Sequence, residues 1–585
     1  MNRNTFREIT CVLNKQQAIR LVGLGIMILI GGLLETLGVG SVLPLVNAIT
    51  NEEKMRSNKW VILIMKMFHI SDMNHFIILL LITVIVIFVV KNLFLLLLTY
   101  VQGKFVNDNQ QRVGSYMLEE YLNRPYEFYL NADIPTIFRI LDGDIPRVFQ
   151  LLMAMISMIT EIVVTICLFV VVFMIDYKMT VFMMVMLLLM TLVINKILKP
   201  RLNKIGKESI EIQSVAGRWR TKAVYGIKDL KVLGHEHFFA SFYDRHTRRG
   251  VKVAVEYNVL NNMPGKIIET ASIGGILLYI AICIMNGVSA NQLLPQISAF
   301  GVAAVRLIPS INRINTYMTN IAYCQPSLDY VYKNVDFSKY KAVGRFIPDK
   351  PKNPEPVTVN DDIYLKGITY KYPNTTKLIL NNADMMIPLG KSVGVVGPSG
   401  AGKSTVIDIF LGLLRPESGT IECSGRNVMD NYQSWLSHIG YIPQVIYLSD
   451  DSIRDNIAFG VPEEDISDDR IWEVLREAQL DRFVEKLPEG LDTSTGDRGI
   501  RISGGERQRL GIARALYHNP EILVFDEATS ALDNVTEKAV MEAINSFHGK
   551  KTMVIIAHRL NTIENCDLIY RVENGAITLD KDNRK

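Results

Sequence analysis

The chain has few cysteines and a small net charge, and its N-terminal residues do not have the pattern of a cleaved signal peptide. Its six cysteines, at positions 11, 167, 283, 324, 423 and 566, are scattered, and no pair has the spacing of metal ligands or of a disulfide framework. A net charge of only +4 gives no reason to expect a nucleic-acid partner. Residues 1–20 are polar and mixed in charge, without a short apolar core and a small-residue cleavage site, so we expect no cleaved signal peptide.

Apolar sequence is what the chain has in excess, and it is unevenly distributed. Hydrophobic residues make up 49% of the 585 residues, and the long uncharged runs crowd into about the first 320 positions. Each run supplies close to the ~20 apolar residues that a bilayer crossing needs, and a buried soluble helix would explain one such run but hardly six. We therefore predict six membrane spans, at about Leu21–Leu45, His75–Tyr100, Phe149–Ile175, Met179–Leu198, Ile267–Met285 and from Leu293 into the region of Arg306 and Arg313.

The connections between these spans alternate in length. The long ones, Gln102–Arg147 and Lys196–Lys266, are rich in lysine and arginine, which places them in the cytoplasm by the positive-inside rule. Their patterns stay helical, so spans two to five are expected to continue past the membrane as cytoplasmic helices. Both termini are then cytoplasmic, and we expect a multi-pass protein of the inner (cytoplasmic) membrane.

The first external connection contains a segment, residues 54–68, that is too short and too charged to span the membrane. It reads as an amphipathic helix with Trp60, Leu63, Met67 and Phe68 available for contact. Two alternatives stay open: this side faces lipid or a partner, or it packs on the neighbouring spans.

A polar, proline-rich linker divides the chain. The expected domains are an all-α transmembrane domain of six helices at 1–335, the linker at 336–360, and an α/β P-loop NTPase domain at 361–585. In the last of these, short β-like runs alternate with helical segments.

The α/β domain contains a phosphate-binding loop, which reads Gly-Pro-Ser-Gly-Ala-Gly-Lys-Ser-Thr over residues 397–405. It lies between a strand-like run, Ser392–Val396, and a helical run, Thr405–Leu414, which is the context that this motif requires. Glycines let backbone N–H groups wrap the phosphates at a helix N-terminus. Lys403 adds a cation, and Ser404 offers a hydroxyl to Mg²⁺. The predicted nucleotide-binding residues of this loop are Gly397, Ser399, Gly400, Gly402, Lys403, Ser404 and Thr405.

A second apolar strand, Glu521–Glu527, ends in two acids. We expect Asp526 to hold Mg²⁺, directly or through water, and Glu527 to polarise the attacking water. Two solvated carboxylates at a strand end are the plain alternative, but it does not explain why such a strand accompanies a phosphate-binding loop.

With these motifs the chain resembles an ATP-binding cassette exporter over nearly its whole length. Tyr372 matches the aromatic residue that stacks on adenine, and Gln444 matches the glutamine that senses Mg²⁺ and faces the membrane domain. Residues 502–506 match the signature motif, and residues 530–533 match the loop that crosses the dimer interface. The resemblance implies ATP contacts from Tyr372, Gln444, Ser503, Gly504 and Gly505, metal contacts from Ser404, Gln444 and Asp526, and catalysis by Glu527 and His558, the last contacting the γ-phosphate.

The signature motif departs from the usual Leu-Ser-Gly-Gly-Gln at both ends, where Ile502 and Glu506 stand. Ser503 and the glycine backbone, which are expected to bind phosphate at a helix N-terminus, are intact. Glu506 adds a negative charge near that position, so we expect slower turnover with activity retained.

In this family the signature of one subunit completes the ATP site of the other, so the resemblance implies that two chains are required. A homodimer is the economical interpretation, and a heterodimer with a similar chain stays open. Closure is expected to reach the spans where the region of Gln444 docks against short helices, at about Glu127–Pro135 and Gly226–Glu236.

Charges within the apolar spans bear on the substrate, because such charges are costly and usually functional. Arg306 and Arg313 are seven residues apart and share a helix face. A cavity lined by them would suit a phosphate or pyrophosphate head group. The alternative is salt bridging within the bundle or snorkelling to the interface. The candidate substrate residues are Lys91, Lys266, Arg306 and Arg313, and the acids available to pair with them are Glu35, Glu161 and Glu269.

A narrower resemblance concerns residues 305–314, which are similar to the matching span of the bacterial flippases for lipid-linked oligosaccharides. Those flippases also resemble this chain at Glu35, at a basic residue in the position of Lys91, and in a short external helix. The resemblance implies transport of a polyprenyl-diphosphate-linked oligosaccharide from the cytoplasmic to the outer leaflet. Before the fifth span, Gly265 stands where an arginine is expected, with Lys266 beside it. A general lipid or multidrug exporter and a membrane-tethered soluble-type ATPase are the alternatives.

Overall fold

The computed structural model of the chain forms two compact units. One, unit 1, is drawn from residues 1–123 and 133–347, and the other, unit 2, from residues 124–132 and 348–585. A short piece of the N-terminal half therefore belongs with the C-terminal half. The structure describes residues 8–9, 12–50, 59–67, 72–175, 177–285, 290–334, 337, 340, 352, 355–496, 499–527, 534–557 and 563–584.

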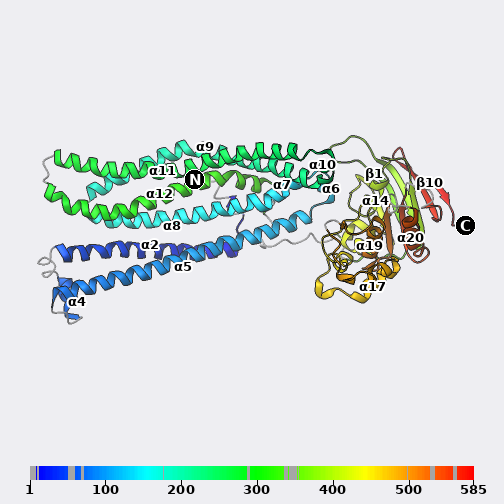
Figure 1. The fold of residues 1–585 in the computed structure, drawn as a ribbon, viewed down its shortest axis with the longest axis horizontal. Helices are drawn as coiled ribbons and strands as arrows, with labels where there is room; N and C mark the ends of the chain where they lie inside the picture. The colour runs from blue at the N-terminus through cyan, green and yellow to red at the C-terminus, as the bar shows by residue number, and fades with distance from the viewer. Residues whose placement is uncertain are drawn as a thin grey trace. The chain divides into compact units, whose positions relative to one another are not determined.

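Unit 1 is a bundle of long helices that run side by side (Figure 1), with α8 and α12 in extensive contact. Among its described residues no strand occurs. Its α-helices are α2 (Lys15–Thr50), α4 (Lys59–Met67), α5 (Met73–Leu122), α7 (Ile134–Arg139), α8 (Ile145–Ile175), α9 (Tyr177–Tyr225), α10 (Ile227–Leu233), α11 (Glu236–Met285) and α12 (Ala290–Asn334).

Five segments among the described residues are long and apolar enough to cross a membrane: Lys15–Gly38, Met73–Leu122, Ile134–Val170, Thr180–Tyr225 and Glu236–Ile282. They coincide with the first five predicted spans, whose helical and apolar character is thereby confirmed. The sixth predicted span falls on α12, where the side chains before Leu307 lie outside the described residues.

The long helices exceed a bilayer in length. The helices α5, α9 and α11 contain 50, 49 and 50 residues, whereas a crossing takes about 20. The helical extensions predicted from the sequence are therefore present. Only 11% of the most apolar window of α5 is buried, so its leucines and isoleucines cover a surface suited to contact with lipid.

The short helix α4 combines the two alternatives left open for residues 54–68. Val61 is buried with Met73 and Phe76 at the start of α5, so one side of α4 packs on the neighbouring span. Leu63 and Met67 are exposed, and they leave an apolar side uncovered within unit 1. The side chains of Trp60 and Phe68 lie outside the described residues.

A single π-helical turn, η1 (Ile140–Asp144), joins α7 to α8. Such turns insert an extra residue into a helix and often mark functional positions. Here Nη1 of Arg139 donates to Oδ2 of Asp144 at 2.5 Å, and the hydroxyl of Ser327 on α12 donates to the other carboxylate oxygen at 3.0 Å. Both side chains of the ion pair are buried.

Unit 2 has two β-sheets with helices around them. In the antiparallel sheet the strand order is β2-β1-β4-β5, and in the second sheet it is β10-β9-β3-β8-β7-β6, where β9, β3, β8, β7 and β6 pair in parallel. The strands are β1 (Ile363–Tyr370), β2 (Leu380–Ile387), β3 (Ser392–Val396), β4 (Ser418–Cys423), β5 (Arg426–Asn427), β6 (Ile439–Ile442), β7 (Ile522–Asp526), β8 (Thr552–Ile556), β9 (Leu568–Glu573) and β10 (Ala576–Asp582). The α-helices are α6 (Tyr126–Leu130), α14 (Lys403–Phe410), α15 (Tyr432–Ser437), α16 (Ile453–Ile457), α17 (Asp468–Glu477), α18 (Asp481–Glu485), α19 (Gly504–Leu516) and α20 (Asn534–Asn545).

The parallel sheet places the expected motifs at one edge. The strand predicted at Ser392–Val396 is β3, and the strand predicted at Glu521–Glu527 is β7, so both predictions are confirmed. Because the carboxyl ends of parallel strands meet at the same edge of a sheet, the segments that follow β3, β6, β7 and β8 converge there.

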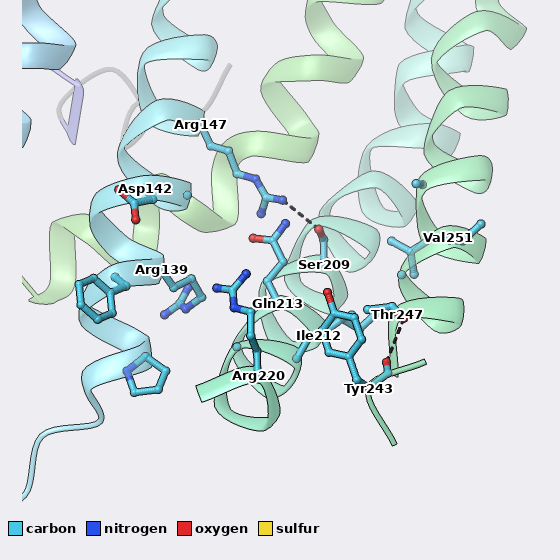
Figure 2. A pocket seen from close by; sticks show the side chains of 18 of the residues that line it. Arg139, Asp142, Arg147, Ser209, Ile212, Gln213, Arg220, Tyr243, Thr247 and Val251 are labelled. Carbon is cyan, nitrogen blue, oxygen red and sulfur yellow. Dashed lines mark hydrogen bonds between the residues drawn. The ribbon is translucent and has the colours of Figure 1, made fainter. Parts of the chain in front are cut away.

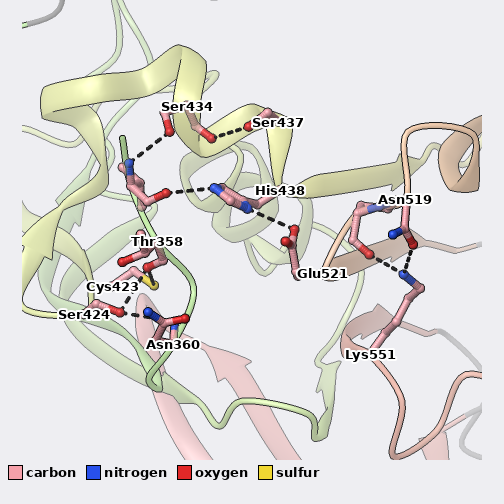
Figure 3. A network of polar contacts seen from close by, with 12 residues as sticks. Thr358, Asn360, Cys423, Ser424, Ser434, Ser437, His438, Asn519, Glu521 and Lys551 are labelled. Atoms are coloured by element: carbon pink, nitrogen blue, oxygen red, sulfur yellow. Dashed lines mark hydrogen bonds and ion pairs between the residues drawn. The ribbon is translucent and has the colours of Figure 1, made fainter. Parts of the chain in front are cut away.

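The end of the linker is fixed to unit 2 by polar contacts (Figure 3). The ring of His438 lies between the linker and β7: Nε2 is 2.8 Å from the carbonyl oxygen of Val357, and Nδ1 is 2.9 Å from Oε2 of Glu521. The backbone N–H of Val357 donates to the hydroxyl of Ser434, and the hydroxyl of Ser424 donates to the carbonyl of Thr358. Residues from Val357 onward therefore belong structurally to the α/β unit.

Candidate nucleotide site and charged membrane residues

The phosphate-binding loop has the backbone conformation that its glycines permit. Gly397, Gly400 and Gly402 have φ angles of +154°, +78° and +104°, a region that side chains disfavour. A Cβ atom at Gly397 would collide with the carbonyl oxygen of Val572 on β9. The loop leads directly into α14, whose first N–H groups are the ready anion site of a helix N-terminus.

Lys403, Ser404 and Thr405 open α14. The ammonium of Lys403 donates to the carbonyl oxygens of Gly397 and Pro398, at 2.9 and 3.1 Å, and so stays over the loop. Thr405 is buried, and its hydroxyl lies 2.9 Å from that of Tyr372. This contact places the predicted adenine-stacking residue next to the start of the phosphate-binding helix.

The acidic residues at the end of β7 meet the segment that follows β6. The amide nitrogen of Gln444 donates to Oε2 of Glu527 at 2.6 Å, and the hydroxyl of Tyr441 lies 3.4 Å from Oδ2 of Asp526. Glu527 has a φ of +50°, which is uncommon for a residue with a side chain and typical of functional positions. The structure thus brings together the residues predicted for metal binding and water activation.

A third carboxylate, Asp408, lies near this pair. Burial, and then the charge of Asp526, raises the pKa of Asp408 to about 6. Asp408 stands one helical turn after Ser404 on α14, so the two share a helix face. The carboxylates of Asp408 and Asp526 concentrate negative charge near Ser404, and a bound divalent cation would neutralise that charge.

The signature motif opens α19. Ile502 and Leu510 belong to a hydrophobic cluster with α16 and α17 that also includes Val396 at the end of β3, whereas Val393 and Val395 of that strand belong to another cluster. Ser503 is the N-cap of α19 and forms a capping box with Glu506: the carboxylate of Glu506 accepts from the N–H and the hydroxyl of Ser503, at 2.9 and 2.6 Å. Glu506, predicted only as an added charge, therefore holds the serine that is predicted to bind phosphate.

Two predicted elements of the site lie outside the described residues. His558 follows directly after β8, and residues 530–533 follow after β7. The roles assigned to them stay predictions.

The segment Arg124–Ala132 belongs to unit 2 and contains α6. The carboxylate of Glu127 accepts the backbone N–H of Arg415 at 2.9 Å. Burial, and then the charges of Asp408 and Tyr372, raises the pKa of Tyr126, which places α6 close to the nucleotide site. This is the first of the two predicted docking segments. The second forms α10, which belongs to unit 1.

Three of the candidate substrate residues are each paired with an acid. Lys91 lies 3.0 Å from Glu35, and both side chains are buried. Arg313 lies 2.6 Å from Glu161, with 52% of its own side chain exposed. Lys266 lies 3.4 Å from Glu269 and is largely exposed, and the side chain of Arg306 lies outside the described residues. Lys91, Lys266 and Arg313 therefore form three separate ion pairs among the described residues.

Sequence reasoning missed Tyr441 and Asp408. A signal for each was present: Tyr441 lies three residues before Gln444 on β6, and Asp408 is the lone charge in the otherwise apolar stretch Val406–Leu414. Tyr126 carried no such signal, because its place beside the nucleotide site depends on residues 124–132 joining unit 2.

Taken together, the fold and this edge of the sheet define a P-loop ATPase fused to a helical membrane bundle. Family models agree: residues 21–302 match the ABC transporter transmembrane region, and residues 380–530 match the ABC transporter domain. The chain belongs to the ABC transporter family, and its enzymatic activity is ATP hydrolysis coupled to transport.

Individual relatives support the same assignment. The heterocyst differentiation ATP-binding protein HepA of Nostoc sp. is 30% identical over 71% of this chain and 67% of its own length. The ATP-dependent lipid A-core flippase of Escherichia coli is 27% identical over 82% of this chain and 80% of its own length. Multidrug resistance protein 1 of Entamoeba histolytica is 33% identical over 61% of this chain, which spans only 28% of that longer protein.

A solved structure shares the fold. The structure of a bacterial Atm1-family ABC exporter with ATP bound matches with a TM-score of 0.76 and 21% sequence identity, over 96% of this chain and 95% of that one. The predicted architecture, a helical transmembrane domain fused to an α/β P-loop domain, is thereby confirmed.

Proposed function

We propose that two copies of this chain form an ATP-driven flippase that moves a polyprenyl-diphosphate-linked oligosaccharide between membrane leaflets. The observation that carries the proposal is the half-exposed guanidinium of Arg313 on α12, held by Glu161 of α8 within a bundle of apolar helices. A charge in such surroundings is costly and is retained where it meets a charged partner. Arg313 has five N–H donors, and Glu161 takes two of them, so donors remain for a phosphate.

The alternative function is a general lipid or multidrug exporter. The relatives favour it in one respect, since one is a lipid A-core flippase and another a multidrug resistance protein. In addition, the candidate cations Lys91, Lys266 and Arg313 are each already paired with an acid, as salt bridging would require. An exporter of this kind predicts ATPase activity stimulated by apolar drugs and no requirement for Arg313.

The ATP site supports the proposed cycle through the placement of its own groups. Lys403 and the N–H groups at the start of α14 hold the phosphates, and Tyr372 supports the base. Gln444 holds the carboxylate of Glu527, which keeps that group positioned to orient a water molecule. As the resemblance to ABC exporters implies, a second copy would supply the signature motif to each site.

The donor atoms near the phosphate loop fit Mg²⁺. The hydroxyl of Ser404, the carboxylate of Asp526 and the amide oxygen of Gln444 are hard oxygen ligands of the kind that Mg²⁺ prefers. Among the described residues no group of three His, Cys, Asp or Glu could hold a metal by itself, so the phosphates of ATP would complete the ligand set. When bound, Mg²⁺ neutralises charge on the β- and γ-phosphates.

We place the protein in the inner (cytoplasmic) membrane, with both termini and the α/β unit in the cytoplasm. The support is the surplus of lysine and arginine in the long connections. ATP is then available at the α/β unit, and the glycan would leave on the opposite side.

The test is flipping of a defined diphosphate-linked glycolipid in reconstituted vesicles. Arg306→Ala and Arg313→Ala should abolish flipping while basal ATP hydrolysis continues. Because Arg313→Ala also leaves Glu161 without its ion-pair partner, the double variant Arg313→Ala with Glu161→Ala separates the missing cation from the stranded carboxylate. Arg248→Ala, an exposed arginine paired with Asp244 on α11, is the matched control. Unchanged flipping in the Arg313 variants would overturn the proposal in favour of the general exporter.

A further inference from the structure

A cavity of about 600 Å³ lies in unit 1, away from Lys91 and Arg313. It is open to one side and is lined by α7, the turn η1, the start of α8, the C-terminal part of α9, the N-terminal part of α11 and Tyr323 of α12. Its volume is in the range of sites for small molecules. Three arginines, Arg139, Arg147 and Arg220, line it together with Gln213 (Figure 2).

The charge of this cavity is unbalanced. Arg139 is paired with Asp144, but Arg147 and Arg220 form no ion pair with any residue that the structure describes. Asp144 does not line the cavity, and Asp142 is the one acid among the described residues that do. Cations held close together repel each other and raise the local concentration of anions.

One of the three arginines has an unsatisfied buried donor. The side chain of Arg139 is only 7% exposed, and its Nε has no hydrogen-bond partner among the described residues. Buried N–H groups are nearly always paired, so an orphan of this kind calls for a ligand or an ordered solvent molecule. It belongs to a guanidinium, whose planar donors suit phosphate oxygens.

Uncharged hydrogen-bonding side chains also line the cavity. Ser209 is buried, and its hydroxyl oxygen lies 3.0 Å from Nη2 of Arg147 and 3.1 Å from the hydroxyl of Tyr323. When both of these groups donate, the serine proton is left to donate into the cavity. Tyr243 and Gln213 contribute a ring and an amide on the side of α9 and α11, as Figure 2 shows.

We propose that this cavity binds a phosphate-bearing organic anion, with Arg147 and Arg220 on the phosphate oxygens, Nε of Arg139 as a further donor, and Ser209, Gln213 and Tyr243 around the polar body. The site lies apart from the substrate residues of the proposed flippase and does not depend on that function. The ligand is either the diphosphate head of a lipid or a soluble organic phosphate, and the chemistry of recognition is the same for both.

Binding of inorganic pyrophosphate to the full-length protein in detergent tests the site. Calorimetry is done in a Lys403→Ala background, which removes the phosphate-loop lysine. One site for each chain is expected, with affinity that falls as salt rises. Arg147→Gln and Arg220→Gln should each weaken binding roughly tenfold or more, since a charge-assisted hydrogen bond is lost. Arg218→Gln is the matched control, because Arg218 lies on the same helix, pairs with Asp133 and does not line this cavity.

The same substitutions with Lys403 intact should retain basal ATP hydrolysis, which shows that the variants are folded. Equal pyrophosphate affinity in the parent, Arg147→Gln and Arg220→Gln proteins would overturn the proposal, as would the absence of pyrophosphate binding. Competition then identifies the source of the phosphate. Displacement of pyrophosphate by a polyprenyl diphosphate in nanodiscs assigns the site to a lipid head, and displacement by a soluble nucleoside diphosphate sugar alone assigns it to a soluble ligand. If neither displaces pyrophosphate, the cavity is not a site for organic phosphates.

Discussion

Ser503 donates both its backbone N–H and its hydroxyl to one carboxylate oxygen of Glu506, at 2.9 and 2.6 Å. The signature motif thus carries its own anion at the N-terminus of α19, where the resemblance implies that phosphate of the partner's ATP binds. Both anions seek the same donors and the same positive end of the helix. We therefore expect the carboxylate that caps the helix to compete with nucleotide.

Glu506→Gln is expected to speed ATP hydrolysis and to lower the KM for ATP severalfold, because the amide keeps the cap without the charge. Steady-state ATPase rates over a range of ATP concentrations would measure this. Glu506→Ala provides the contrast: it removes the charge and half of the capping box, at a cost of about 1 kcal/mol to the helix. If Glu506→Gln matches the parent in both kinetic constants, the carboxylate does not compete.

Glu127 connects the α6 segment to the rest of unit 2 through the N–H of Arg415. Glu127→Ala should leave ATP binding intact, because the phosphate loop is untouched, but weaken the communication between the membrane helices and the nucleotide site. The measurement is the ratio of transport to ATP hydrolysis in vesicles, which should fall severalfold. Glu127→Gln keeps an acceptor oxygen and should recover most of the coupling. An unchanged ratio in Glu127→Ala would show that this bond plays no part in it.

Asp408 gives the stability of the nucleotide-free protein a pH dependence of known sign. Its pKa is raised in the folded state to about 6, from an ordinary value of 3.8. Between these values the folded protein binds more protons than the unfolded chain, so stability falls as pH rises from about 4 to about 6 and then levels off.

Asp408→Asn should remove the fall in stability between about pH 4 and about pH 6. At pH 7 the thermal midpoint of the variant should therefore lie above that of the parent, and the difference should shrink toward pH 4. Thermal scans at one fixed rate on detergent-solubilised protein would measure it, with the exposed Asp361→Asn as control. A constant difference across the pH range would contradict the assignment of the shift to Asp408.

His438 joins the linker to β7 through Val357 and Glu521, as Figure 3 shows. His438→Ala would remove both contacts and loosen the attachment of the linker. Limited proteolysis should then cut near residue 357 severalfold faster, with little change in ATP affinity. Ser437→Ala, one residue away, removes only a hydroxyl bonded to its own helix and should cut at the parent rate.

Much of the nucleotide site could be predicted because the residues that form it lie close together in the sequence, in short motifs. The phosphate loop needs adjacent glycines, and its strand and helix flank it directly, so Gly397 to Thr405 specify their own geometry. The capping box was also present, as the pattern of Ser503 followed three residues later by Glu506. That pattern was read only as a change of charge within a family motif.

Contacts between distant helices could not be predicted in the same way. Lys91 and Glu35 are 56 positions apart, and the choice between a ligand and an ion pair depends on how α2 and α5 pack. The arginine cavity is harder still, since it draws on η1, α8, α9, α11 and Tyr323 of α12. Periodicity identifies the face on which a residue lies, but not which other helix that face meets.

The π-helical turn between α7 and α8 has a consequence for the direction in which Arg139 points. In an α-helix two residues five positions apart point about 140° away from each other, so Arg139 and Asp144 could not meet along a regular helix. The wider turn brings them to the same side, and their 2.5 Å ion pair depends on one surplus residue. Deleting Gly143 would rewind the segment and rotate everything before it by about 100°. The π-helical turn therefore sets the rotation of the helix about its axis, and with it the side of the helix on which the buried Arg139 lies.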